Sequence, residues 1–208
     1  RNGQSYATVQ VGTQCWMAEN LNIGTRINSD EEGYQQTDNA LIEKYCYNND
    51  PAQCETYGAL YEWPEAMQYV TQQGTRGICP PNWHIPTDSE LKTLTGTLDS
   101  QYPAGHPEWD KVGKCGLDAG GNMKEAGLIH WEEPNTGATN SSGFTGLPGG
   151  YRNIYDWGFF DMGELGTFWS STQSDAQTAW SRYLNYNDAR VSRFVTDKTN
   201  GFSVRCVK

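Results

Sequence analysis

The chain has 208 residues, with 25 acidic and 15 basic side chains and a formal net charge of -10. Because a nucleic-acid backbone is bound through a basic surface, this balance excludes nucleic acid as a partner. No linker or repeat divides the sequence, so we expect a single domain over residues 1–208. Gly (23), Tyr (12) and Trp (8) are abundant, which favours a loop-rich fold with aromatic side chains in its core.

Six cysteines are spread over the chain without a Cys-x-x-Cys pair. An even number in this spacing is typical of a disulfide framework rather than a zinc site, and it predicts a secreted or cell-surface protein. No apolar run is long enough to cross a membrane, and no secretory signal begins at Arg1. We therefore expect a mature or excised piece whose signal or anchor has been removed.

The N-terminal part, residues 1–21, is predicted to be a β-hairpin. Residues 5–11 alternate in character and are joined to residues 15–18 by a Gly-containing turn. Farther along, Asp50-Pro51 is a turn signal between Cys46 and Cys54, so a disulfide between these two cysteines would close a local loop.

Two helices are expected in the region 57–100. The first follows Trp63 and has Pro64 at its first position. The second has the stronger signature, because Thr87 and Glu90 form a capping box ahead of leucines at helical spacing. The segment between the two helices contains three prolines and predicts an extended crossover, and residues 99–143 predict long loops.

The region 143–208 predicts a short antiparallel sheet. Strand-like pieces rich in aromatic and β-branched residues are separated by turns, and they cover residues 143–152, 168–172, 179–184 and 201–207. Alternation over residues 180–187 places Tyr183 and Asn185 on one face of a strand and Arg182 on the other. We expect one face to be core and the other to be open to ligand. Two helices and a late sheet together predict an α+β fold.

Three groups of residues also carry a resemblance to a known family. They are residues 12–21, which contain Trp-Met-Ala-Glu-Asn-Leu, residues 57–63 with 79–88, and the closing Gly-Phe-Ser-Val-Arg-Cys-Val of residues 201–207. In these motifs the chain resembles the Fibrobacter succinogenes major paralogous domain family of secreted bacterial domains. The resemblance implies a C-type-lectin-like fold, with two helices packed on a short twisted antiparallel sheet, long loops, disulfides and the C-terminus beside the N-terminus.

The lectin-like fold implies a long-range disulfide between Cys79 and Cys206. With Cys46 and Cys54 as the local bridge, Cys15 and Cys115 are left to form a third.

No catalytic constellation is visible, so no catalytic residue is predicted and we expect the chain not to be an enzyme. The three histidines lack zinc-site spacing and no Gly-x-Ser-x-Gly occurs. Calcium is the more serious candidate cofactor, because lectin-like folds often hold calcium in their long loops and oxygen ligands are plentiful here. The candidate ligands are Asp156, Asp161, Glu164 and Asp188. Glu133-Pro134-Asn135 matches a sugar-binding tripeptide of C-type lectins but lacks its downstream companion, so we treat it as a chance match.

The main candidate for ligand contact is a group of aromatic, amide and arginine side chains in the C-terminal sheet and adjoining loops. Flat rings beside amides suit the faces and hydroxyls of a sugar, or the hot spot of a protein partner. The residues expected to contact ligand are Trp157, Phe159, Tyr183, Asn185, Asn187, Arg190 and Arg193. The sequence thus predicts a secreted or cell-surface module that binds a glycan or a surface protein.

Three alternatives stay open. A cysteine oxidase of the formylglycine-generating type shares a lectin-like fold and uses a pair of redox cysteines, which a thiol titration would reveal. A diversified binding domain would vary rapidly at the same sheet positions. A structural head domain of a surface fibre would need no ligand site.

Overall fold

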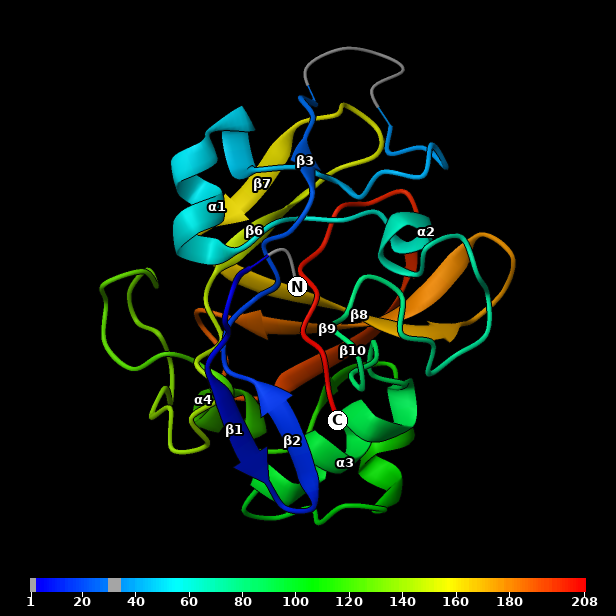
Figure 1. Cartoon of the computed structure of the whole chain (residues 1–208). Helices are drawn as coiled ribbons and strands as arrows, with labels where there is room; N and C mark the ends of the chain where they lie inside the picture. The colour runs from blue at the N-terminus through cyan, green and yellow to red at the C-terminus, as the bar shows by residue number, and fades with distance from the viewer. Residues whose placement is uncertain (1–2, 30–34) are drawn as a thin grey trace.

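The computed structural model describes residues 3–29 and 35–208. It shows a mixed α/β protein built around a six-stranded sheet with the order β5-β10-β9-β8-β6-β7 (Figure 1). Neighbouring strands run antiparallel, except that β6 and β8 pair in parallel. The strands are β5 (Gly113–Cys115), β6 (Gly149–Arg152), β7 (Phe159–Met162), β8 (Leu165–Gln173), β9 (Thr178–Asn185) and β10 (Val191–Asp197).

The predicted N-terminal hairpin is confirmed. Strand β1 (Thr8–Val11) pairs antiparallel with β2 (Gln14–Met17) across the Gly12-containing turn, where Gly12 adopts a positive φ of 57°. A second small sheet joins β3 (Thr25–Arg26) and β4 (Glu43–Lys44) in parallel.

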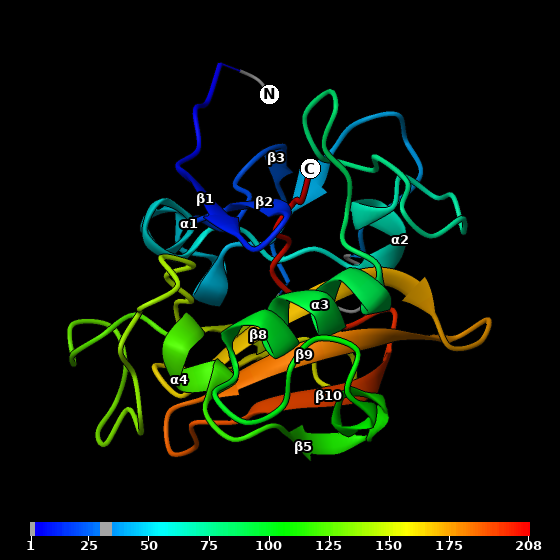
Figure 2. The same ribbon diagram turned by 90° about the horizontal axis from the view of Figure 1, so that it is seen from below.

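The helix expected after Thr87 is confirmed as α3 (Asp88–Leu98). The Thr87 hydroxyl accepts a hydrogen bond from the Glu90 N–H, and the Glu90 carboxylate accepts one from the Thr87 N–H. Leu91 and Leu94 are buried. Figure 2 shows α3 lying across one face of the sheet, over β8 and β9.

The other helices differ from the expectation of two. The helix predicted after Trp63 is only a single turn, α2 (Trp63–Ala66). It ends there because Gln68 and Tyr69 adopt positive φ and turn the chain. Two further helices form, α1 (Pro51–Tyr57) and α4 (Ala119–Met123), together with the short 3-10 segments η1 (Tyr47–Asn49) and η2 (Pro107–Asp110). None of the helices in the described part of the chain is long and apolar enough to cross a bilayer.

The strand predicted at residues 201–207 does not form, and the last strand of the sheet lies earlier in the chain. Residues 191–197, for which no strand was predicted, form β10. Residues 201–207 form no continuous strand, and instead make isolated bridges to five separate segments. The reason is their path: they run across the sheet and end beside β2, where Cys15 and Lys208 exchange backbone hydrogen bonds (Figure 1).

Apolar side chains cover most of both faces of the central strands, so the expectation of one fully open face of β9 is wrong, and only the part beside Tyr183 borders a surface hollow. On one face Phe168 and Leu184 pack with Leu91 and Leu94 of α3. On the other face Trp169 and Tyr183 pack with Phe202 of the C-terminal segment and with other aromatic side chains. That segment fills the place at which we expected solvent.

Two of the three expected disulfides are confirmed, Cys46–Cys54 and Cys79–Cys206. The second joins residues 127 positions apart and fixes the C-terminal segment to the turn before α3. The third is wrong, because Cys15 and Cys115 are free. Cys115 is buried on β5, where its thiol contacts the carbonyls of Lys111 and Gly113, while Cys15 lies on β2 between Gln10 and Lys208.

Candidate functional site

The loop between β6 and β7, residues 153–158, presents aromatic side chains in two directions. It is closed by a 2.8 Å hydrogen bond from the Asn153 N–H to the Gly158 carbonyl. Tyr155 is 85% exposed, and Trp157 is half-buried with a positive φ of 59°. Tyr155 lines one surface hollow and Trp157 lines another, so this loop lies between two candidate sites.

The first site, which we call the tyrosine hollow, has a volume of about 300 Å³. Three of its walls are tyrosines from separate elements: Tyr151 on β6, Tyr155 on the loop and Tyr183 on β9. Its other lining residues are Asn153, Asp161, Leu165, Thr196, Asn200 and Phe202. Flat rings with amide, hydroxyl and carboxylate groups beside them are the combination that a sugar ring or a protein hot spot requires.

Tyr183 is a rigid part of this hollow. Its ring packs edge-on against Phe194 and Phe202, with centroid distances of 5.3 and 5.5 Å, and its hydroxyl lies 3.1 Å from the Thr196 hydroxyl. Burial raises the pKa of Tyr183, which keeps its hydroxyl protonated. Burial also raises the pKa of Asp161 on the opposite wall. Tyr183 therefore belongs both to the hollow and to the hydrophobic core.

The second site, the tryptophan hollow, has a volume of about 310 Å³ on the other side of the loop. Trp157 and Phe159, two of the residues expected to contact ligand, line it. Phe159 packs against Tyr47 with a centroid distance of 5.4 Å. The remaining lining residues are Ser29, Asn48, Asn49, Asp156 and Gly158.

Asn185, Asn187 and Arg190 line neither of these hollows and instead build the turn between β9 and β10. The Asn185 side chain accepts from the Asn187 N–H, and Arg190 makes two hydrogen bonds to the Asp188 carboxylate. These contacts stabilise the turn itself.

Arg193 was predicted to contact ligand, but it is buried. Its guanidinium donates to both carboxylate oxygens of Asp88, at 2.9 and 2.7 Å, and lies 3.3 Å from the Trp180 ring centroid. Arg182 donates to the same carboxylate at 2.8 Å. Arg193 therefore connects β10 to α3 and does not face a ligand.

The calcium candidates are dispersed. Among residues 3–29 and 35–208, no three His, Cys, Asp or Glu side chains are grouped so as to hold a metal ion. Asp188 is already paired with Arg190 and with Lys114, and hydrogen bonding to Arg190 is the main cause that holds its pKa well below the ordinary value. Asp156 and Asp161 line different hollows, and Glu164 lines neither.

A buried lysine joins the loops close to Asp188. The Lys124 ammonium donates to the carbonyls of Thr136, Asn185 and Asp188 at 2.9, 2.8 and 3.1 Å. Burial lowers the pKa of Lys124 to about 8. Nearby, the Asn135 amide of the Glu-Pro-Asn tripeptide donates to the carbonyls of Glu125 and Gly127. Both side chains thus hold loop backbone in place.

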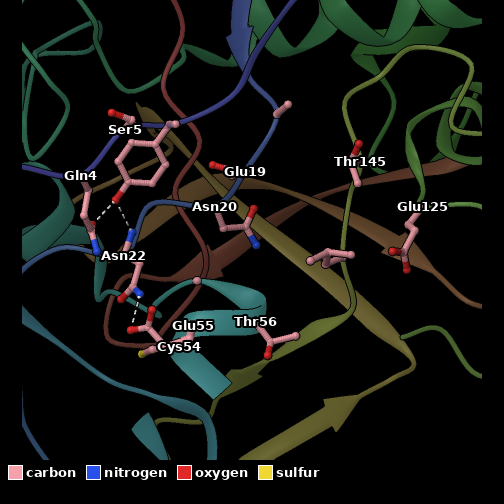
Figure 3. Close-up of a pocket in the computed structure, with 14 residues that line it drawn as sticks. Gln4, Ser5, Glu19, Asn20, Asn22, Cys54, Glu55, Thr56, Glu125 and Thr145 are labelled. Atoms are coloured by element: carbon pink, nitrogen blue, oxygen red, sulfur yellow. Dashed lines mark hydrogen bonds between the residues drawn. The ribbon is translucent and has the colours of Figure 1, made fainter. Parts of the chain in front are cut away.

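A third and larger hollow, which we call the polar hollow, was not predicted from the sequence. It has a volume of about 420 Å³, and Figure 3 shows Glu55 and Glu125 on opposite sides of it. Several of its polar groups are already engaged: the Asn20 amide donates to the Tyr57 carbonyl and the Ser203 hydroxyl, and Asn22 donates to Glu55. Its lining residues are scattered from Gln4 to Leu147, so no sequence motif marks it.

The comparisons with known proteins identify a family. The family model of the Fibrobacter succinogenes major domain matches residues 9–208. No curated protein and no solved structure matches the chain. The match includes the hairpin, α3, the six-stranded sheet and the C-terminal segment, as the motifs in the sequence predicted. The chain belongs to the Fibrobacter succinogenes major domain family.

Proposed function

We propose that this chain is a secreted or cell-surface module that binds a glycan or a protein ligand through the tyrosine hollow. The observation that carries the proposal is the convergence of Tyr151, Tyr155 and Tyr183 around a hollow of about 300 Å³ with polar groups at its rim. Tyr155 is 85% exposed, and a large ring held in solvent beside a hollow is typical of a ligand contact.

A C-type-lectin-like fold is part of the proposal. Three features support it: α3 packs on one face of the sheet, long loops follow α3, and the C-terminal segment returns to the N-terminal hairpin. The two disulfides support an extracytoplasmic location, because such bridges persist in oxidising compartments.

The environment of the free cysteines argues against the cysteine oxidase alternative. A reactive thiol has a lowered pKa and some exposure. Burial instead raises the pKa of Cys115. Cys15 lies on β2 and Cys115 on β5, in different sheets. We therefore favour a module without redox chemistry.

A glycan array tests the proposal, with Tyr155→Ala as the diagnostic variant. Truncating an exposed aromatic anchor should weaken binding by about tenfold or more while the melting temperature stays unchanged. Ile129→Ala is the matched control, since Ile129 is 82% exposed but lines none of the three hollows. Repeating the array with a chelator decides whether calcium takes part. Equal binding by wild type and Tyr155→Ala on every glycan or protein that the chain captures would contradict the proposal.

A further inference from the structure

Arg152, the last residue of β6, holds its guanidinium between two aromatic rings. Its central carbon lies 4.5 Å from the Tyr45 ring centroid and 4.8 Å from the Trp157 ring centroid. The residue is 0% exposed. Its hydrogen bonds are from Nε to the Ser29 hydroxyl at 2.6 Å, and from Nη1 to Glu62 and to the Thr199 carbonyl at 3.0 Å each.

The remaining nitrogen of Arg152 is unsatisfied. Within residues 3–29 and 35–208, Nη2 has no hydrogen-bond partner. A buried charged donor without an acceptor is costly, and such groups are rare in folded proteins. The two rings stabilise the positive charge through their π faces but do not supply an oxygen lone pair. An acceptor oxygen is therefore the group that this site lacks.

Ser29 and Trp157 connect Arg152 to the tryptophan hollow, because both contact Arg152 and both line the hollow. The Ser29 hydroxyl also donates to the Trp157 carbonyl at 2.7 Å, which holds the backbone of Trp157, while its ring packs on the Arg152 guanidinium. Trp157 has a positive φ of 59°, a conformation that bulky residues rarely adopt and that is often found at ligand-binding loops.

The charges around the site favour a neutral acceptor. Glu62 already balances the charge of Arg152, and the Asp156 carboxylate lines the hollow, so an anionic ligand would be repelled. An amide carbonyl is a strong acceptor without charge. An N-acetyl group adds a methyl that suits the Trp157 and Phe159 rings, and an N–H that suits the carboxylate of Asp156.

We propose that the tryptophan hollow binds the acetamido group of an N-acetylated sugar, whose carbonyl oxygen accepts a hydrogen bond from Arg152 Nη2 once the Trp157 ring has turned aside. This site lies on the opposite side of the loop from the tyrosine hollow and goes beyond the function proposed for that hollow.

Two trimeric sugars test this directly, because chitotriose and cellotriose differ only in having an acetamido group or a hydroxyl at the second carbon. Calorimetry should show binding of chitotriose and at least tenfold weaker binding of cellotriose. The deacetylated trimer, which keeps the nitrogen but loses the carbonyl, should bind as weakly as cellotriose. In NMR spectra, the indole N–H signal of Trp157, identified by its absence in Trp157→Phe, should shift with chitotriose alone.

Two variants test the contact with Arg152. Arg152→Lys keeps a positive charge but removes Nη2, and it should weaken chitotriose binding at least tenfold. If this variant does not fold, the shift of the Trp157 indole signal in the wild-type chain decides the question. Ile129→Ala changes an exposed side chain outside the three hollows and should leave chitotriose affinity within about twofold. Equal affinity for the two trimers, or an unmoved Trp157 signal, overturns the proposal. Binding of N-acetylglycine amide as tight as that of chitotriose overturns the assignment to a sugar.

Discussion

Replacing Asp88 by asparagine tests whether one carboxylate joins α3 to the sheet. Asp88 is 6% exposed and accepts hydrogen bonds from both Arg182 and Arg193. The variant keeps the size of the side chain but leaves two buried guanidinium groups without their counter-charge. Removing one partner of a buried ion pair costs roughly 3–5 kcal/mol of unfolding free energy. For a chain of this length, that loss corresponds to a melting temperature lower by about 6–20 °C.

The effect of Asp88→Asn should depend on pH. Burial alone would raise the pKa of Asp88, but the hydrogen bonds and charges of Arg193 and Arg182 outweigh burial and hold the pKa well below its ordinary value. Because the folded pKa is depressed, the stabilisation is complete above the unfolded pKa of about 3.9 and is lost as the pH falls toward the folded pKa. The gap in stability between wild type and Asp88→Asn should therefore be constant near neutral pH and shrink below about pH 4.

Denaturant unfolding at pH 7 measures these differences, with Asp110→Asn as the control. Asp110 also pairs with Lys92, as Asp88 does, but its side chain is 71% exposed, so the control should unfold like the wild type. A loss below about 1 kcal/mol for Asp88→Asn would show that this carboxylate does not hold α3 to the sheet. In that case Arg182 and Arg193 would not need the carboxylate.

Three further predictions follow from other contacts. Thr87→Ala removes the cap of α3 and should lower the unfolding free energy by about 0.5–2 kcal/mol without changing ligand affinity; an unchanged melting temperature would contradict this. Lys124→Met leaves buried carbonyls without a donor and should cost roughly 1–3 kcal/mol at pH 7. Because burial lowers the folded pKa of Lys124 from 10.5 to about 8, the stability of the wild type relative to this variant should rise between those two pH values, and a flat difference in denaturant titrations would contradict it. Thiol titration of the denatured, unreduced chain should find two free thiols, Cys15 and Cys115, and finding none would show a third disulfide.

Short sequence motifs correctly predicted the helix and the hairpin whose ends are stabilised by neighbouring residues. The capping box of Thr87 and Glu90 identified α3, and the turn at Gly12 identified the hairpin. Helix α1 was missed although Asp50 is its N-cap and Pro51 its first residue, so the sequence carried a helix signal as well as a turn signal. Helix α4 has only a weak signal, because its N-cap Asp118 makes no cap hydrogen bond and two glycines follow. Its place depends on close packing, since a Cβ at Gly121 would lie 2.2 Å from the Gly137 carbonyl oxygen.

The candidate site was only partly predictable, because exposure on a strand depends on what covers it. Alternation correctly separated Tyr183 from Arg182 but gave no information on the C-terminal segment, whose Phe202 covers Tyr183. The buried Arg193 guanidinium is hydrogen-bonded to Asp88, which lies 105 positions earlier in the sequence. Trp157 and Phe159 do share a hollow, since they are close in sequence where loop 153–158 enters β7. For Tyr183 and Arg193, contacts with distant segments determine how far the side chain is exposed.

Chemical-shift mapping locates the bound ligand, which we expect at the two hollows on either side of loop 153–158. Amide signals of the ¹⁵N-labelled chain would be followed during titration with the tightest ligand from the array. We expect the shifts to cluster in residues 153–161, with smaller shifts in β9 beside Tyr183, and α3 to be unaffected. Shifts centred on the polar hollow around Glu55 and Glu125, or on the loops of residues 99–143, would contradict it.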